Sequence, residues 1–532
     1  MIKIFSLLTL LGTSVFSYAQ VDSDKIATTQ KFDEVLTYVN RLYVDDVDSE
    51  KLTDAAIVAL LEKLDPHSTF ISKEDVDDAN QKIKGNFVGI GIRFQILRDT
   101  LMVVATIPGG PSEKLGLQPG DKIVKIGSEN VAGVGLKNSQ VRDRLMGDRG
   151  TKVTVAVQRK KKRSPIDYVI TRDLIPVNSV DASYMINDNT GYIKLNSFSR
   201  STHQECREAI KDLKEQGMEN LVFDLQGNGG GLLYASKYLA DEFLTDDKLI
   251  VYSEGRSQPR VDLSAEKKGL WEEGRLVLLT NEYTASASEI LSGAVQDWDR
   301  GLIIGRRTYG KGLVQRPIDL TDGSQLRLTI ARYYTPSGRS VQKSYENLDD
   351  YRNDLINRYD RGEFSSKDSI SLPDSLKFET LLNKRTVYGG GGIMPDYFVP
   401  LDTMETTDFY TDLVRSGSFN SYSLTYVDEN REDILSDYPT FAEFKNNFEI
   451  DKKFMNKFIK YAQDEDDELE MDDEEFNTSE SLIKLRMKAL IAQSLWGYNE
   501  FYQVYNESNE ILQKAIEVIE SKEYKSALKS QK

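Results

Sequence analysis

Cysteine and histidine are scarce in this sequence. Its 532 residues include one cysteine, Cys206, and two histidines, His67 and His203. A single cysteine excludes intramolecular disulfides, and with them the small disulfide-stapled scaffolds of many exported proteins. These three residues form no cluster with recognised zinc-ligand spacing, so we expect no metal and no cofactor. Two histidines also leave few candidates for the base of a Ser-His-Asp triad.

Basic residues are also fewer than acidic ones, with 68 Lys and Arg against 85 Asp and Glu. The formal net charge is −17 at pH 7, which argues against nucleic acid or an anionic membrane surface as a partner. Beyond the N-terminal residues, no stretch of the sequence is long and apolar enough to cross a bilayer. The length suggests three or four domains.

Residues 1–19 have the pattern of a secretory signal peptide. Lys3 gives a positive start, an apolar stretch follows, and Ser17-Tyr-Ala19 forms a small-residue cleavage site before Gln20. A membrane anchor is the alternative, but the apolar stretch is short for a span. We therefore expect an exported protein. A bacterial periplasm fits, because a chain of this size can rely on a large core in place of disulfides.

Two short motifs carry the candidate chemistry. Ser286 lies in Thr284-Ala-Ser-Ala-Ser-Glu289, and Lys311 lies between two glycines. This pattern suggests a serine nucleophile with a lysine general base. The lysine takes a proton only when it is neutral, and burial lowers its pKa from the ordinary value of about 10.4. The alternative is that Ser286 is an ordinary helix cap or turn residue.

Further motifs stand in order along the chain. They are Asp65-Pro-His-Ser-Thr-Phe70, Gly89-Ile-Gly-Ile92, Gly191-Tyr-Ile-Lys-Leu195, Asp224-Leu-Gln-Gly-Asn-Gly-Gly-Gly231, Tyr333-Tyr-Thr-Pro-Ser-Gly338 and Gly389-Gly-Gly-Gly-Ile-Met-Pro-Asp396. With the serine and lysine motifs, this series resembles the C-terminal processing peptidases, also called tail-specific proteases. The resemblance runs from about residue 31 to residue 400.

The resemblance implies roles for the reacting side chains. Ser286 matches the nucleophile and Lys311 the general base, and Gln315 matches a glutamine that orients the lysine from one helical turn later. No cofactor is implied. The chain departs from the family at Gln226, where an arginine is usual, so the anchoring of that loop is in doubt.

The resemblance also implies an oxyanion hole built from backbone N–H groups. One would come from Ala287, which follows the serine, and one from Gly230 or Gly231 in the glycine run. Glycine suits this role because the backbone must approach the developing oxyanion closely.

Residues 85–173 resemble a PDZ domain. A glycine-containing loop followed by strands and a short helix can expose backbone N–H groups to a peptide's terminal carboxylate, while the peptide adds a strand to the sheet edge. The alternative is that these glycines form only a tight strand entry. The candidate peptide-binding residues are Val88, Gly89, Ile90, Gly91 and Ile92.

The periodicity of apolar residues predicts a multidomain α/β protein. After the signal peptide we expect an N-terminal helical region at 22–84, a PDZ-like β domain at 85–173, an α/β serine peptidase core with a Ser/Lys dyad at 174–400, and an acidic helical C-terminal extension at 401–532. Residues 345–380 read as a loop-rich insertion. The acidic run 464–475 reads as a solvated linker.

One nucleotide-binding interpretation competes at the lysine. Gly305-Arg-Arg-Thr-Tyr-Gly-Lys311 fits most of a phosphate-binding P-loop, but Gly312 replaces the serine or threonine that holds magnesium.

The leading hypothesis is an exported serine endopeptidase that binds apolar C-terminal tails of protein or peptide substrates through its PDZ domain and cleaves them through an acyl-enzyme. A homodimer through the N-terminal helices and an adaptor or regulatory protein are further expected partners. The alternatives are a non-catalytic PDZ adaptor, or a protease held inactive until a partner binds.

Overall fold

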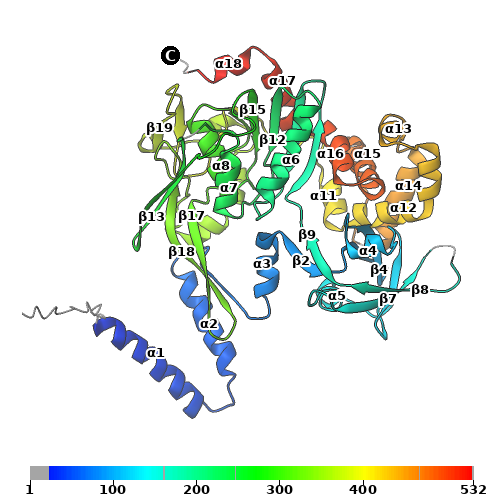
Figure 1. The fold of residues 1–532 in the computed structure, drawn as a ribbon, viewed down its shortest axis with the longest axis horizontal. Coiled ribbons are helices and arrows are strands. Elements are labelled where there is room, and N and C mark those ends of the chain that lie inside the picture. The colour runs from blue at the N-terminus through cyan, green and yellow to red at the C-terminus, as the bar shows by residue number, and fades with distance from the viewer. Residues whose placement is uncertain (1–22, 160–161, 246, 467, 530–532) are drawn as a thin grey trace, which may run out of the picture. The chain divides into compact units, whose positions relative to one another are not determined.

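A computed structural model describes residues 23–159, 162–245, 247–466 and 468–529 (Figure 1). The predicted signal peptide lies outside these residues. The chain divides into two compact units, residues 1–64 and 65–532. Within the described part, no helix combines the length and the apolar character that a membrane span requires.

Within its described residues, 23–64, the first unit contains the helices α1 (Ser23–Leu42) and α2 (Ser49–Glu62). Asp48 caps α2, because its side chain accepts the N–H of Lys51 at 3.1 Å. Several apolar side chains of this unit are exposed, among them Leu42. Helices α1 and α2 confirm the helical structure predicted for this part of the chain.

Helical structure does not continue through the rest of the region predicted as helical. Residues Thr69–Ile71 form strand β1, which pairs antiparallel with β18 (Gln325–Tyr334) in the second unit. A last helix, α3 (Val76–Lys84), ends at Gly85, which adopts the left-handed conformation with φ of 71°.

A six-stranded sheet forms the centre of the second unit. Its order is β10-β11-β12-β15-β16-β21, and every neighbouring pair is parallel except β10 with β11. The central strands β12, β15 and β16 are mainly apolar and buried, as is usual where helices cover both faces of a parallel sheet. Their bounds are β10 (Val180–Met185), β11 (Thr190–Leu195), β12 (Asn220–Asp224), β15 (Arg275–Thr280), β16 (Leu302–Gly305) and β21 (Tyr397–Phe398).

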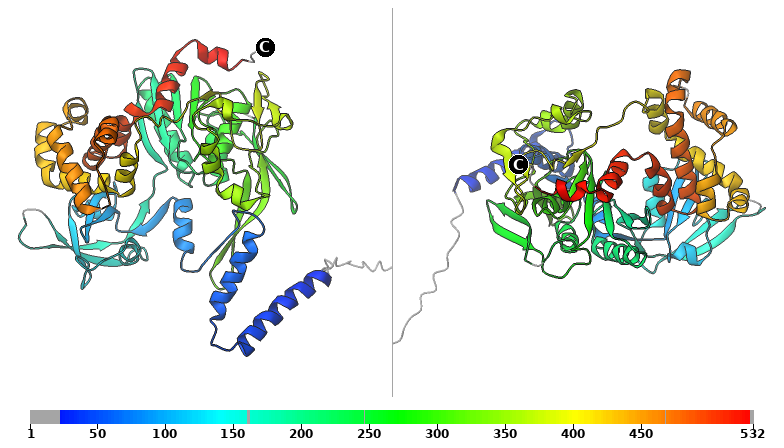
Figure 2. Two further views of the ribbon diagram at one scale, coloured as in Figure 1. Left: turned by 180° about the vertical axis from the view of Figure 1, so that it is seen from behind. Right: turned by 90° about the horizontal axis from the view of Figure 1, so that it is seen from above.

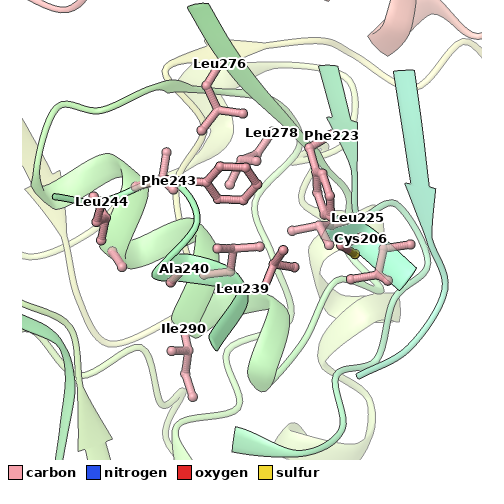
Figure 3. Packing of buried hydrophobic residues seen from close by; sticks show 14 of the residues in the cluster. Cys206, Phe223, Leu225, Leu239, Ala240, Phe243, Leu244, Leu276, Leu278 and Ile290 are labelled. Carbon is pink, nitrogen blue, oxygen red and sulfur yellow. The ribbon is translucent and has the colours of Figure 1, made fainter. Parts of the chain in front are cut away.

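Alternate residues of these strands pack against different layers of helices. Phe223, Leu276 and Leu278 point to one face, where they pack with side chains of α6, α7 and α8 (Figure 3). Val222 and Val277 point to the other face and pack against α17. The helices are α6 (Thr202–Glu215), α7 (Leu233–Ala240), α8 (Ala287–Asp297) and α17 (Glu510–Glu520).

A second sheet lies beside the lysine motif. β18 pairs with β1, with β13 and with β17, and β14 pairs with β13. The bounds are β13 (Leu249–Gly255), β14 (Gln258–Ser264) and β17 (Leu313–Asp319).

The predicted insertion contains short helices as well as loops. Its elements are α9 (Leu348–Arg352), α10 (Asp354–Asp360), η1 (Lys367–Ser369), η2 (Asp374–Leu376) and β19 (Lys377–Glu379). Strand β20 (Thr386–Tyr388) follows the insertion and pairs with β19.

The PDZ domain has its own sheet and its own core. The sheet order is β3-β4-β5-β7-β8, with β6 paired to β5, so β3 is an edge strand. A two-stranded ribbon of β2 and β9 joins the domain to the rest of the chain. The bounds are β2 (Asn86–Gly89), β3 (Ile92–Leu97), β4 (Thr100–Thr106), α4 (Pro111–Lys114), β5 (Lys122–Ile126), β6 (Glu129–Asn130), α5 (Asn138–Leu145), β7 (Lys152–Gln158), β8 (Ile166–Thr171) and β9 (Asp173–Pro176).

The C-terminal extension is helical, as predicted. An aromatic-rich core joins its helices from α11 to α16, and α17 then packs on the central sheet. The bounds are α11 (Asp408–Arg415), α12 (Ser418–Asp437), α13 (Phe441–Asn447), α14 (Lys452–Glu465), α15 (Asp473–Leu495), α16 (Tyr498–Tyr505), η3 (Asn506–Ser508) and α18 (Glu523–Ala527).

Part of the acidic run is structural. The Asp472 side chain accepts the N–H groups of Glu474 and Glu475 at 2.8 and 3.0 Å, which caps the start of α15. The Glu475 carboxylate in turn accepts the N–H of Phe409 on α11 at 2.7 Å. The description of this run as a solvated linker is therefore wrong for its C-terminal part.

The extension also contacts the PDZ domain (Figure 2). Gln95 Nε2 donates to Ser421 Oγ at 3.4 Å, and the Arg93 guanidinium lies 4.6 Å from the centre of the Tyr498 ring. The extension thus contacts both the outer face of the PDZ sheet and the central sheet.

Candidate active site

Ser286 lies between a central strand and a helix. β15 ends at Thr280, a short turn follows, and α8 begins at Ala287. Ser286 has φ of 58° and ψ of −115°, a conformation that costs energy for a residue with a Cβ and is found mainly at functional sites. Thr284 holds the turn by donating its hydroxyl to the Leu225 carbonyl at 2.9 Å.

Lys311 lies in a turn between β16 and β17 and is partly buried. Burial lowers the pKa of Lys311, the charges of Glu289 and Asp65 oppose this, and Arg327 lowers the pKa further. The direction favours a neutral amine. A strand follows the turn, where a P-loop requires a helix, so the phosphate-binding interpretation of this motif is wrong.

The buried Glu289 carboxylate links the serine turn to the lysine turn. Its Oε2 accepts the N–H of Ser286 at 2.8 Å and the N–H of Lys311 at 2.8 Å. Its Oε1 accepts the N–H of Gly310 at 2.7 Å and the hydroxyl of Thr308 at 2.5 Å. Burial raises the pKa of Glu289, and these donors oppose the rise. Four donors occupy the acceptor sites of an ionised carboxylate.

Tyr333 makes a second link between the same turns. Its hydroxyl donates to the Ser286 carbonyl at 3.0 Å and also contacts the Lys311 carbonyl. The side chain is fully buried. Glu289 and Tyr333 therefore fix the backbones of the two predicted reacting residues relative to each other. Sequence reasoning assigned neither role, although both residues stand in the quoted motifs.

Gln315 contacts the lysine from a strand. Lys311 Nζ donates to Gln315 Oε1 at 3.3 Å, and Gln315 Nε2 donates to the His67 carbonyl. The predicted spacing of one helical turn is wrong, because Gln315 belongs to β17 and follows an irregularity in that strand's register. Both side chains of the predicted dyad are described, and the structure records no direct Ser286 Oγ–Lys311 Nζ hydrogen bond.

The glycine loop after β12 lies against the serine turn. Asn228 carbonyl oxygen accepts the N–H of Ala285 at 3.0 Å. An added Cβ at Gly230 would meet Ser286 Cβ at 2.7 Å and the Ala287 nitrogen at 2.9 Å, so only glycine fits there.

The N–H groups of this loop differ in availability. Gly230 donates its N–H to Asn228 Oδ1 at 2.9 Å. Ala287 is the first residue of α8, so its N–H has no partner within the helix. Gly231 has φ of 146°, and an added Cβ would lie 2.0 Å from the Phe198 carbonyl oxygen. Of the two glycines, Gly231 is therefore the one whose N–H is not already bonded within the described structure.

Other residues anchor the loop where the family usually has an arginine. Lys194 Nζ donates to Asp224 Oδ1 at 3.2 Å, and the same oxygen accepts the Gln226 N–H at 2.7 Å. Asn228 Nδ2 donates to the Leu195 carbonyl at 3.0 Å. The loop is therefore anchored without an arginine at position 226.

The predicted peptide-binding residues form the entry to the edge strand of the PDZ sheet. Val88 and Gly89 end β2, and Ile92 begins β3. Ile90 is buried, and its carbonyl accepts the N–H and the hydroxyl of Ser112 at 3.1 and 2.6 Å. Gly91 has φ of 76°, a conformation that favours glycine.

Comparison with known proteins places these observations in a family. Residues 189–349 match peptidase family S41, residues 102–159 match the PDZ domain, and residues 409–497 match a family of unknown function. The carboxy-terminal-processing protease of Bartonella bacilliformis is 37% identical over 317 residues, which are 59% of this chain and 72% of that protein.

Two further comparisons cover a similar share of the chain. A probable CtpA-like serine protease of Staphylococcus aureus is 33% identical over 317 residues, 59% of this chain and 63% of that protein. The solved structure of the photosystem II D1 C-terminal processing protease is 30% identical and covers 60% of this chain and 91% of that chain, with a TM-score of 0.33. By its sequence identity to the Bartonella protein across most of that protein's length, the chain belongs to the carboxy-terminal-processing proteases of peptidase family S41.

Proposed function

We propose that the chain is a serine endopeptidase that uses Ser286 as nucleophile and Lys311 as general base. The observation that carries this proposal is the double link by which Glu289 and Tyr333 hold the two turns together. A scaffold without chemistry has no need to tie the turn of a strained serine to the turn of a partly buried lysine.

In the proposed reaction, neutral Lys311 takes the Ser286 hydroxyl proton as Oγ attacks the substrate carbonyl. The developing oxyanion accepts hydrogen bonds from the N–H groups of Ala287 and Gly231. Gly231 is favoured over Gly230 because the Gly230 N–H already donates to Asn228. Collapse of the intermediate breaks the peptide bond, and Lys311 returns its proton to the leaving amine. Water then attacks the acyl-enzyme with Lys311 again as base, which releases the acid and free Ser286.

The PDZ domain supplies substrate selection in this proposal. A C-terminal tail would add as a strand to the open edge of β3, with its carboxylate at the loop that contains Ile90 and Gly91. Apolar tails fit the apolar side chains that this strand contributes to the domain core, such as Phe94. Export to the periplasm, a homodimer through the N-terminal helices and an adaptor protein belong to the same proposal.

The test compares wild type with Ser286→Ala and Lys311→Ala on an unfolded reporter with an apolar C-terminal tail, free or amidated. Cleavage by wild type alone, weakened by amidation, supports the dyad and the tail-binding domain. Cleavage that survives Ser286→Ala rejects the assignment. Folded proteins that all fail to cleave favour an adaptor or a partner-gated protease.

A further inference from the structure

His67 lies in a turn that is fixed to the second sheet. Asp65 Oδ1 accepts the N–H groups of His67 and Ser68, both at 2.8 Å, and the hydroxyl of Thr329 on β18 at 3.1 Å. The strand that follows the turn, β1, pairs with β18. The position of the His67 backbone is therefore fixed by β18. This strand also pairs with β17, which contains Gln315.

The His67 carbonyl determines how Gln315 faces the lysine. A glutamine amide has one donor end and one acceptor end. Because Gln315 Nε2 donates to the His67 carbonyl, Oε1 is left to accept from Lys311 Nζ, as observed at 3.3 Å. The reverse orientation would place the amide donors against the lysine and leave two oxygens facing each other at His67.

The His67 ring is held by the insertion. Its Nε2 lies 2.5 Å from the Tyr351 hydroxyl, and the two rings meet edge to face with centres 5.5 Å apart. Tyr351 is buried on α9. Burial, helped by the charges of Lys311 and Lys343 and opposed by Asp65, lowers the pKa of His67 to about 4, so the ring is neutral near neutral pH.

The insertion is itself bound to the chain just before the lysine turn. The fully buried Arg358 donates to the carbonyls of Arg307 and Thr308 at 2.8 and 3.2 Å. Glu363 accepts two hydrogen bonds from Arg307, both at 2.7 Å, and one from Arg358 at 2.8 Å. Lys343 Nζ contacts Asp354 Oδ2 at 2.9 Å. These bonds hold the insertion, and with it Tyr351, in place beside His67.

We propose that His67 is a positioning residue for the reaction: its carbonyl sets the orientation of Gln315 on Lys311, and Tyr351 of the insertion holds its ring in place. The inference rests on the proposed function of Ser286 and Lys311. His67 acts through Gln315 and does not take the serine proton, because its Nε2 already faces Tyr351.

The test measures kcat, KM and the pH profile of the full-length protein with Tyr351→Phe, His67→Ala and both changes together. Tyr351→Phe removes the contact with His67 and the contacts of the same hydroxyl with Tyr309 and Gln342, and it should lower kcat roughly threefold to tenfold with KM unchanged. His67→Ala should lower kcat more, and the double variant should lose less than the product of the two single losses, because the two side chains act through one shared contact.

The matched control is Tyr345→Phe. The Tyr345 hydroxyl accepts from Arg332 at 3.0 Å, and its ring also meets the Tyr351 ring, with centres 6.5 Å apart. This variant removes a tyrosine hydroxyl from the same region without touching His67, so kcat should stay at the wild-type value.

A pH readout separates positioning from loss of structure. The groups that face Lys311 are Glu289, Asp65, Arg327 and His67. Truncating His67 admits water beside the lysine and relieves its desolvation, so the rise of kcat/KM with pH should move to higher pH in His67→Ala. Thermal unfolding of the wild type and variants is measured alongside.

Unchanged kcat and an unchanged pH profile in both single variants would overturn the inference, while an inactive Ser286→Ala would leave the proposed function standing. If wild type cleaves no reporter, the titration of Lys311 is followed by NMR of carbon-13-labelled lysine, assigned with Lys311→Ala. An upward shift in His67→Ala supports the positioning role, and an identical titration rejects it.

Discussion

Replacing Glu289 with glutamine is the sharpest test of how the two turns are held together. The change keeps the size of the side chain and replaces one oxygen by an amide group. In the structure each carboxylate oxygen accepts from two donors: Oε2 from Ser286 and Lys311, and Oε1 from Thr308 and Gly310. In the less costly orientation the amide group replaces Oε1: the Thr308 hydroxyl can turn to accept from it, and the Gly310 N–H loses its acceptor, while the remaining oxygen still accepts from Ser286 and Lys311.

The expected magnitude follows from these contacts. A buried donor left without a partner costs about 1–3 kcal/mol, so Glu289→Gln should lower the free energy of unfolding by about 1–3 kcal/mol. The Gly310 N–H next to Lys311 loses its acceptor, so the lysine turn is held less firmly, although Tyr333 and the remaining glutamine oxygen still link it to the serine turn. A displacement of about 1 Å can lower kcat by about a hundredfold, so we expect a loss of up to that size.

The assay is urea denaturation, with the slope of the transition compared to the wild type, together with kcat on the cleaved reporter. The control is Glu475→Gln in the extension, since Glu475 accepts one backbone N–H and a glutamine oxygen can still do so. It should lose no more than about 1 kcal/mol and no activity. The reasoning would be refuted by a Glu289→Gln protein with wild-type stability and wild-type kcat.

Three more outcomes are expected. The value of kcat/KM should rise with pH through the pKa of Lys311, because only the neutral amine accepts the Ser286 proton. Burial lowers this pKa, so the rise should occur below the ordinary pKa of lysine. A pH profile without such a rise contradicts the assignment of Lys311 as the base. Gly231→Ala should abolish cleavage, since the new methyl would lie 2.0 Å from the Phe198 carbonyl oxygen; a fully active variant contradicts the loop geometry. Ile511→Ala should destabilise the protein by about 2–4 kcal/mol in equilibrium unfolding, because Ile511 is buried against the central sheet; an unchanged midpoint means that α17 adds no stability.

The sequence predicts those parts of the fold and site that local patterns encode. Apolar periodicity and the ordered motifs indicated the α/β core, the PDZ domain and the helical extension, and the structure and the comparisons confirm them. The catalytic roles of Ser286 and Lys311 stay predictions. The helical position of Gln315 was wrong: a separation of four residues suggests one helical turn, but Lys311 lies in a turn and Gln315 lies on the strand that follows it.

The contacts that sequence reasoning missed join distant residues. His67 and Tyr351 are 284 positions apart, and Tyr351 stands in a polar segment whose composition resembles a surface loop. Glu289 was visible in the serine motif, yet a glutamate at the third position of a helix reads first as a local cap. Its contact with the lysine turn depends on how β16 and α8 pack, which no local pattern contains.

The ribbon of β2 and β9 has a consequence for the modularity of the chain. In its register Asn86 lies opposite Pro176 and Gly89 opposite Asp173, so the polypeptide enters and leaves the PDZ domain at the same point. A domain whose two ends lie side by side can be excised and the gap closed by a tight hairpin turn. The PDZ domain is therefore an insert in the strand order of the core, and exchanging it would leave that order intact but remove the contacts that Ser421 and Tyr498 of the extension make with it.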